Sequence, residues 1–91
     1  GGSLCWNYVA ACCPTAILAL GAELELARLD DGEVVHRRIS IDAFLTGALS
    51  TARLPDELLT TIHLAPRPAT SGSAYRKWGL VTDALPVIGL A

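Results

Sequence analysis

Two alternating segments joined by an Asp-Gly pair constrain the fold of this chain more than any other feature. In residues 22–26, three apolar side chains alternate with two glutamates, which is the pattern of a strand with one buried face. Asp31 and Gly32 predict a type I′ turn, because that turn needs positive φ and glycine adopts it without strain. Residues 33–41 then return as a second strand, so the sequence predicts an antiparallel hairpin.

The two-residue turn also fixes which residues of the hairpin face each other. It places Glu25 opposite Arg38 on the solvent face, where opposite charges form a favourable cross-strand pair. It places the apolar Leu26 opposite the charged Arg37, which breaks the buried pattern. We therefore predict a β-bulge near residues 27–29. The pairs expected on the buried face are Leu24 with Ile39 and Ala22 with Ile41.

A short helix is expected before the hairpin, at residues 15–20. It follows Pro14, which suits the first turn of a helix, and precedes Gly21, which suits the position just past a helix end. The segment is apolar nearly all round. We therefore expect this helix to be buried on more than one side.

A second helix is predicted after the hairpin, with Ser40 or Asp42 as its cap; it runs through Leu45 and is ended by Gly47. The remaining predicted segments are an irregular connection at 48–54, a turn at 54–57, a strand at 58–64 with its even-numbered residues on one face, an exposed loop at 66–72, a strand at 73–80, a turn at 82–83 and a buried strand at 85–91. Together these elements predict an α+β fold with a small, mostly antiparallel sheet and two or three short helices.

The composition is apolar for a chain of 91 residues, with 52% hydrophobic and only 18% charged residues. We interpret the excess as surface that contacts another domain or subunit; the alternative is a small, well-filled core. The net charge of −2 gives no electrostatic signature of nucleic-acid binding. No apolar run reaches the roughly 18–20 residues of a membrane span. We therefore expect neither nucleic acid nor a membrane as a partner.

Few residues suggest catalysis or metal binding. Cys5, Cys12 and Cys13 are odd in number and form no disulfide framework, which favours a reducing, cytoplasmic location. Their spacing lacks the Cys-x-x-Cys pair of structural zinc sites. His36 and His63 fall on exposed strand faces, and no nucleophile stands beside a base in a recognisable pattern. We therefore expect no metal and assign no catalytic residue.

Two stretches carry side chains or backbone suited to a ligand. The opening pair, Gly1 and Gly2, would let backbone approach a phosphate in a nest-like loop, unless it is an ordinary turn. Residues 75–78, Tyr-Arg-Lys-Trp, could stack on a flat ring and contact an anion. Their composition also fits a strand of mixed polarity.

The order of these segments resembles a known family. Gly-Gly-Ser-Leu at 1–4 is followed by the helix, the strand that begins within 21–26, the Asp-Gly turn and Ile-Asp-Ala-Phe-Leu-Thr-Gly at 41–47. Leu-Pro-Asp-Glu-Leu-Leu at 54–59 and Ser-Ala-Tyr-Arg-Lys at 73–77 complete the series. The series is similar to the FAD-binding (medium, flavoprotein) subunit of the molybdenum hydroxylases, the carbon monoxide dehydrogenase and xanthine dehydrogenase family, over nearly all of the chain.

The resemblance implies that residues 1–91 are a single partial domain, equivalent to the family's second FAD subdomain. It implies a fragment of an oxidoreductase subunit that passes electrons through FAD, with molybdopterin and iron–sulfur subunits or domains as partners. The isolated chain is expected to be inactive. The residues that the resemblance places near the cofactor are Gly1, Gly2, Ser3, Leu59 and Lys77.

The alternative is a non-catalytic remnant or an assembly module that has lost FAD binding and forms homo-oligomers. Cys12 stands where the family carries an aspartate that holds the cofactor. A thiol cannot accept the hydrogen bonds that an ionised carboxylate accepts. The sequence leaves both functions open.

Overall fold

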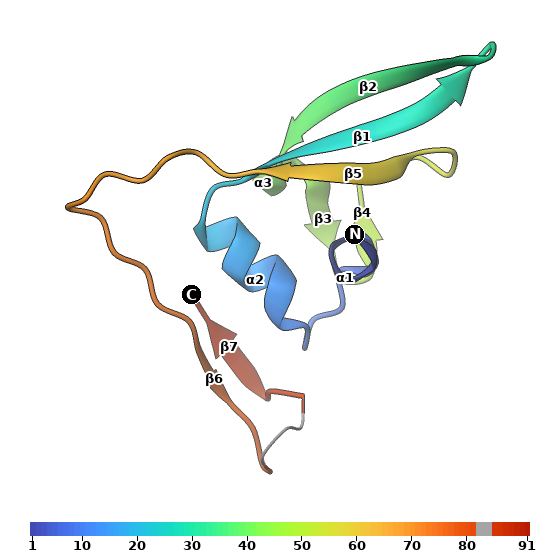
Figure 1. Cartoon of the computed structure of the whole chain (residues 1–91). Coiled ribbons are helices and arrows are strands. Elements are labelled where there is room, and N and C mark those ends of the chain that lie inside the picture. The colour runs from blue at the N-terminus through green and yellow to red at the C-terminus, as the bar shows by residue number, and fades with distance from the viewer. Residues whose placement is uncertain (82–84) are drawn as a thin grey trace.

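The computed structural model describes residues 1–81 and 85–91 and shows an α+β fold, which confirms the predicted class (Figure 1). Its helices are α1 (Gly2–Trp6), α2 (Cys12–Ala19) and α3 (Ile41–Phe44). Its strands are β1 (Glu23–Asp30), β2 (Glu33–Ser40), β3 (Leu45–Gly47), β4 (Ser50–Thr51), β5 (Leu58–His63), β6 (Arg76–Trp78) and β7 (Ile88–Leu90). The predicted turn at 82–83 lies outside the described residues.

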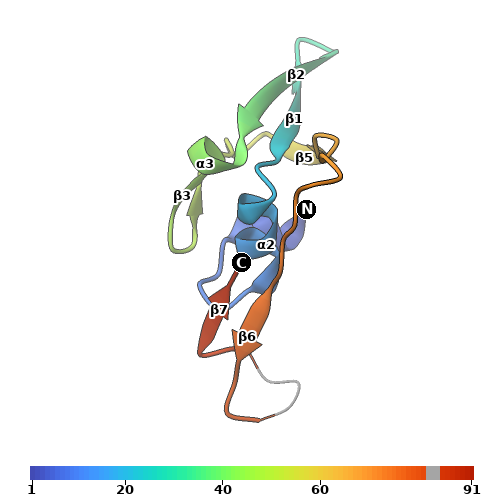
Figure 2. The ribbon, with the colours of Figure 1, turned by 90° about the vertical axis from the view of Figure 1, so that its left-hand side faces the viewer.

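The strands form one three-stranded sheet and two small ribbons. The sheet has the order β2-β1-β5, and β3 pairs with β4 and β6 with β7, all antiparallel. Figures 1 and 2 show the sheet at one end of the molecule and the β6–β7 ribbon at the other, with α2 between them. The body is elongated and flat, with extents of 49 × 33 × 19 Å.

The predicted hairpin is confirmed in position and register. Glu25 faces Arg38 across the β1–β2 ladder, and the ladder runs without interruption to the turn. Asp31 and Gly32 have φ values of 48° and 80°, the positive pair that a type I′ turn requires. The buried-face pair Leu24 with Ile39 is also in place, and the Ile41 N–H donates to the Ala22 carbonyl at 2.9 Å.

The predicted bulge in this hairpin is wrong. The only irregularity in the described sheet lies on the other side of β1, between Glu25 and Leu26, where the pairing with β5 shifts. Leu26 is fully buried opposite Arg37, whose side chain is 40% exposed. No bulge is needed because the Arg37 guanidinium does not pack against Leu26. It binds the side-chain carboxylate of Glu57 instead.

The predicted ion pair between the facing residues Glu25 and Arg38 is also not formed. Arg38 instead contacts Glu23 at 3.5 Å, one step along the same strand face. The Glu25 carboxylate lies 2.9 Å from His36 on β2 and 2.9 Å from His63 on β5. Diagonal neighbours are within reach of long side chains, and the two histidines win over the directly opposed arginine.

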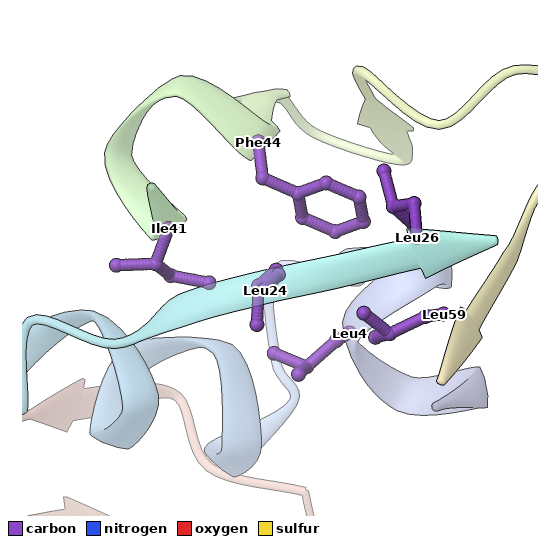
Figure 3. Close-up of a cluster of buried hydrophobic side chains, with 6 residues drawn as sticks. All are labelled: Leu4, Leu24, Leu26, Ile41, Phe44 and Leu59. Carbon is purple, nitrogen blue, oxygen red and sulfur yellow. The ribbon is translucent and has the colours of Figure 1, made fainter. Parts of the chain in front are cut away.

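The core lies between the inner face of the sheet and helices α1 and α3. Figure 3 shows its side chains gathered along β1, contributed by Leu4, Leu24, Leu26, Ile41, Phe44 and Leu59. Fully burying a Leu, Ile or Phe side chain contributes about 1.5–3 kcal/mol. On β5 the core residue is Leu59, whereas the neighbouring Leu58 is 69% exposed.

Helix α2 is less buried than its sequence predicts. Its C-terminal end agrees with the prediction, since Gly21 follows the last turn with a φ of 63°, but the helix begins at Cys12 rather than at Thr15. Pro14 is its one buried residue, however, and Leu18 is 43% exposed. Helix α2 contacts α1, α3 and β7, but these contacts leave most of its residues partly or fully exposed. The prediction of a helix buried on more than one side is therefore wrong.

The last predicted strand is also exposed rather than buried. The strand β7 forms, but Ile88 and Leu90 are 63% and 70% exposed, respectively. Its partner β6 is likewise exposed along its length. The ribbon pairs its backbone groups without covering its apolar side chains.

Helix α3 begins as predicted and ends earlier. Ser40 is its cap, with its Oγ accepting from the Ala43 N–H at 3.3 Å. The helix stops at Phe44, and the residues up to 51 form the β3–β4 ribbon instead of continuing helix and an irregular connection. A residue distant in sequence supports this ribbon: the Asn7 side chain donates to the carbonyls of Gly47 and Ser50 at 2.6 and 3.1 Å.

Within the part of the chain that the structure describes, every helix is too short or too polar to cross a lipid bilayer.

Candidate functional site

An open groove of about 240 Å³ lies where helix α1 meets the start of β5. It is lined by Gly1, Gly2, Cys5, Arg53, Glu57, Leu58 and Leu59. The lining combines apolar side chains with one exposed arginine and two residues without side chains. Such a mixture suits a ligand that has both a flat apolar part and a charged part.

The two glycines stand at one side of this groove, Gly1 as the N-cap of α1 and Gly2 as its first residue. The pair therefore opens a helix, where the sequence allowed either a nest-like loop or an ordinary turn. A Cβ on Gly1 would lie 3.7 Å from the Leu59 carbonyl oxygen, and a Cβ on Gly2 would meet nothing within 4 Å. The glycines are therefore not demanded by the fold, and their effect is to leave the groove open.

The opposite wall depends on a buried carboxylate, that of Glu57. Arg37 donates to both of its oxygens, from Nε at 2.6 Å and Nη2 at 2.8 Å, and the Leu54 N–H donates a third bond at 2.8 Å. The Arg37 hydrogen bonds are the largest cause that lowers the pKa of Glu57 from 4.5 to about 2. Glu57 is 5% exposed and stays ionised at neutral pH, so it shapes the wall and does not exchange protons.

Arg53 is held at the groove by the same segment of chain. Its Nη1 donates to the carbonyl oxygens of Leu54 at 3.1 Å and Glu57 at 2.8 Å. These bonds hold the guanidinium beside the wall. They use only Nη1, so Nε and Nη2 take no part in them. The turn that carries these residues was predicted, and the Glu57 N–H closes it on the Leu54 carbonyl at 3.1 Å.

The structure brings three of the five sequence-predicted contact residues together. Gly1, Gly2 and Leu59 line the one groove. Ser3 is exposed on α1 and is not part of the lining. Lys77 is exposed on β6, at the end of the molecule away from the sheet (Figures 1 and 2).

The sequence analysis did not identify Arg53 and Glu57 as site residues. Their local signal is a pair of charges flanking a Pro-Asp turn, which reads as an ordinary exposed turn. The partner that buries Glu57 is Arg37, which lies 20 residues earlier on a different strand. The mismatch of that arginine with a buried leucine was the one available clue.

A second, smaller cavity of about 130 Å³ lies between α2 and the β6–β7 ribbon. Tyr75 lines it, and its buried hydroxyl lacks a well-oriented hydrogen-bond partner among the described residues. The neighbouring Cys12 thiol, followed by desolvation, raises the pKa of the Tyr75 phenol. A Cβ on Gly89 would lie 2.9 Å from the Tyr75 oxygen, so any side chain there would require the Tyr75 ring to shift.

Metal binding finds no support in residues 1–81 and 85–91. No group of three or more His, Cys, Asp or Glu side chains is arranged to hold an ion. The three cysteines are free thiols.

Comparison with known proteins gives one family and one fold. Residues 1–68 match the sequence model of the family described as "FAD binding domain in molybdopterin dehydrogenase". No curated protein matches the chain. Among solved structures, the chain is similar to quinoline 2-oxidoreductase from Pseudomonas putida 86, with a TM-score of 0.78 and 23% identity. The similarity covers 98% of this chain and 29% of that one, so the chain spans less than a third of the matched protein chain.

Proposed function

Since the chain belongs to the family of FAD-binding domains in molybdopterin dehydrogenases, we propose that its groove holds part of an FAD molecule. The observation that carries the proposal is that the family match and the groove lining involve the same residues. The family match extends over residues 1–68, and within it Gly1, Gly2 and Leu59, which the family resemblance implies as contacts, line a single groove. We propose further that residues 1–91 are one partial domain of a larger flavin-binding unit.

The size and lining of the groove fit a portion of the cofactor. Pockets that enclose a whole drug-sized ligand measure roughly 300–1,000 Å³. A groove of about 240 Å³ is smaller than these, so it accommodates one ring system or one charged segment of a dinucleotide. Leu58 and Leu59 offer an apolar surface to a flat ring, and the glycine side lets it approach without a clash.

The role that we propose for the chain's own residues is to bind FAD and to orient it. When bound, FAD supplies electron transfer, and the protein positions it and adjusts its surroundings. In this proposal Leu59 and Gly1 contact the part of FAD that enters the groove, while the Arg37–Glu57 pair keeps the opposite wall rigid. Ser3 and Lys77 remain proposed contacts for the part of FAD that extends beyond the groove.

We also propose the partners and the setting that the family implies. The chain would pass electrons through FAD within a complex that contains molybdopterin and iron–sulfur subunits or domains, in the cytoplasm. The match to a much longer oxidoreductase chain supports a larger protein around this fold.

The test is a titration of the 91-residue chain with FAD, followed by quenching of flavin fluorescence. We predict saturable quenching, which Gly2→Leu weakens because its side chain fills the open side of the groove. The variant should fold at least as well as the wild type, because a helical glycine costs up to about 1 kcal/mol in propensity and its Cβ meets nothing. The matched control is Gly72→Leu, in the exposed loop and equally free of contacts.

A chain that neither turns yellow nor quenches added FAD would refute the proposal, as would equal affinities for the two leucine variants. Ser3→Ala and Lys77→Ala in the same titration decide whether these two residues also contact the cofactor.

A second candidate function is assembly without FAD. The observation that favours it is the exposure of large apolar side chains on β6 and β7, where Trp78, Ile88 and Leu90 are 59–70% exposed. Light scattering separates the two functions, because an assembly module forms a defined oligomer whether or not FAD is present and ignores the flavin.

A further inference from the structure

Arg53 carries a charge that the groove does not otherwise use. Its guanidinium is anchored by two carbonyl oxygens, those of Leu54 and Glu57, rather than by an acid. Within residues 1–81 and 85–91 it forms no ion pair, whereas Arg28, Arg37 and Arg38 each contact a carboxylate. An arginine held in place but not neutralised is prepared to bind an anion.

The charge balance of the groove points the same way. Glu57 is the one acidic residue in the lining, and Arg37 already binds both of its oxygens. The pair is neutral together, so the charge of Arg53 is left over. Glu57 offers Arg53 its backbone carbonyl and not its side chain.

We propose that Arg53 binds a phosphate group of the ligand in this groove. This inference rests on the proposed function, where the ligand is FAD and the phosphates are those of its diphosphate. A guanidinium matches a phosphate with parallel N–H···O bonds. The other side of the groove is formed by Gly1 and Gly2, which present no side chain to obstruct the phosphate oxygens.

The experiment compares three probes, FAD, riboflavin and inorganic pyrophosphate, on the wild-type chain and its variants. Riboflavin has the flavin ring and lacks phosphate, and pyrophosphate has the charge and lacks the ring. We expect Arg53→Gln to weaken FAD and pyrophosphate about tenfold or more, because hydrogen bonds to charged groups are among the strongest. Riboflavin affinity should not change.

Two controls isolate the guanidinium. Arg38→Gln removes the same charge from the outer face of the sheet, away from the groove, and should leave all three affinities unchanged. Arg53→Lys keeps the charge without the planar fork and should lose part of the FAD affinity. Thermal melting of each variant reports whether the segment anchored by Arg53 stays folded. If Arg53→Gln fails to fold, Arg53→Lys decides, because it must bind FAD more weakly than the wild type while its riboflavin affinity holds.

The outcomes separate this inference from the function beneath it. If the wild type binds FAD and Arg53→Gln binds it equally well, the role of Arg53 is overturned and the flavin function stands. The same holds if riboflavin weakens as much as FAD. If the wild type binds neither flavin, the flavin function fails, and the pyrophosphate titration alone decides whether Arg53 binds an anion.

Discussion

The residue on which the groove wall depends most is Glu57. Its side chain is 2% exposed and receives three hydrogen bonds, two from Arg37 and one from the Leu54 backbone. A carboxylate satisfied in this way stays where it is and stays ionised. The network joins the wall of the groove to the sheet through a single side chain.

We predict that Glu57→Gln destabilises the fold by about 2 kcal/mol at neutral pH. The cost of breaking a fully buried pair is roughly 3–5 kcal/mol, and it is smaller here because Arg37 is 40% exposed and regains water. Urea unfolding of the two proteins measures the difference. A change near zero would show that the pair does not stabilise the fold.

The lowered pKa of Glu57 also predicts how the stability of the fold depends on pH. Because the folded-state pKa of Glu57 is lowered from 4.5 to about 2, its contribution is fully present above pH 4.5 and is lost as pH falls towards 2. The difference in free energy of unfolding between the wild type and Glu57→Gln should therefore become smaller as pH falls from 4.5 towards 2. A gap that is the same at pH 7 and pH 2.5 would contradict the assignment.

At the scale of elements, the three-stranded sheet is joined on its outer face by Glu25. This residue of the central strand β1 contacts His36 on one neighbour and His63 on the other, both at 2.9 Å. The other charged groups on this face are Arg38, directly opposite Glu25, and Glu23, which Arg38 contacts. One side chain therefore connects all three strands.

We predict that Glu25→Gln speeds amide hydrogen exchange in both outer strands, β2 and β5. The hydrogen bond with His63 is the largest cause that lowers the pKa of Glu25, so its stabilisation is present above pH 4.5 and is lost as pH falls below it. The effect should thus be clear at pH 6 and shrink in acid. The control is Glu23→Gln, which removes an exposed pair and should affect exchange in β5 little.

The turn of the hairpin supplies a second prediction at this scale. Gly32→Val should destabilise the fold by about 1–2 kcal/mol, because a φ of 80° is strained for any residue with a Cβ and more so for a branched one. Gly72→Val, at an ordinary φ, serves as the comparison in thermal melts. Equal melting temperatures would argue against the I′ turn.

For the whole molecule, the sequence predicted what neighbouring residues decide. The register of the hairpin, the Ser40 cap and the Gly21 helix end each follow from a few adjacent residues. What it missed depends on contacts distant along the chain. The β3–β4 ribbon depends on the Asn7 side chain, which reaches carbonyls 40 and 43 residues away.

The burial of the elements and the residues of the candidate site likewise depend on contacts that are distant along the chain. Apolar patterning predicted covered surfaces for α2 and β7, but patterning states that a residue can be buried and not what lies against it. Gly1, Gly2 and Leu59 came from a family resemblance that preserves order along the chain. Glu57 could be identified only once β1 was placed between β2 and β5, because its partner Arg37 reaches it across that strand. Arg53 could be identified only once the groove beside it was known.

The bridge from Arg37 to Glu57 has a mechanical consequence. It crosses the central strand, so β2 at the edge of the sheet is tied directly to the wall of the groove. A change that loosens the hairpin formed by β1 and β2 should therefore alter ligand affinity at the groove, although the hairpin turn does not line it. The Gly32→Val variant tests this coupling, because a loosened hairpin should also change the FAD affinity that we propose for the groove.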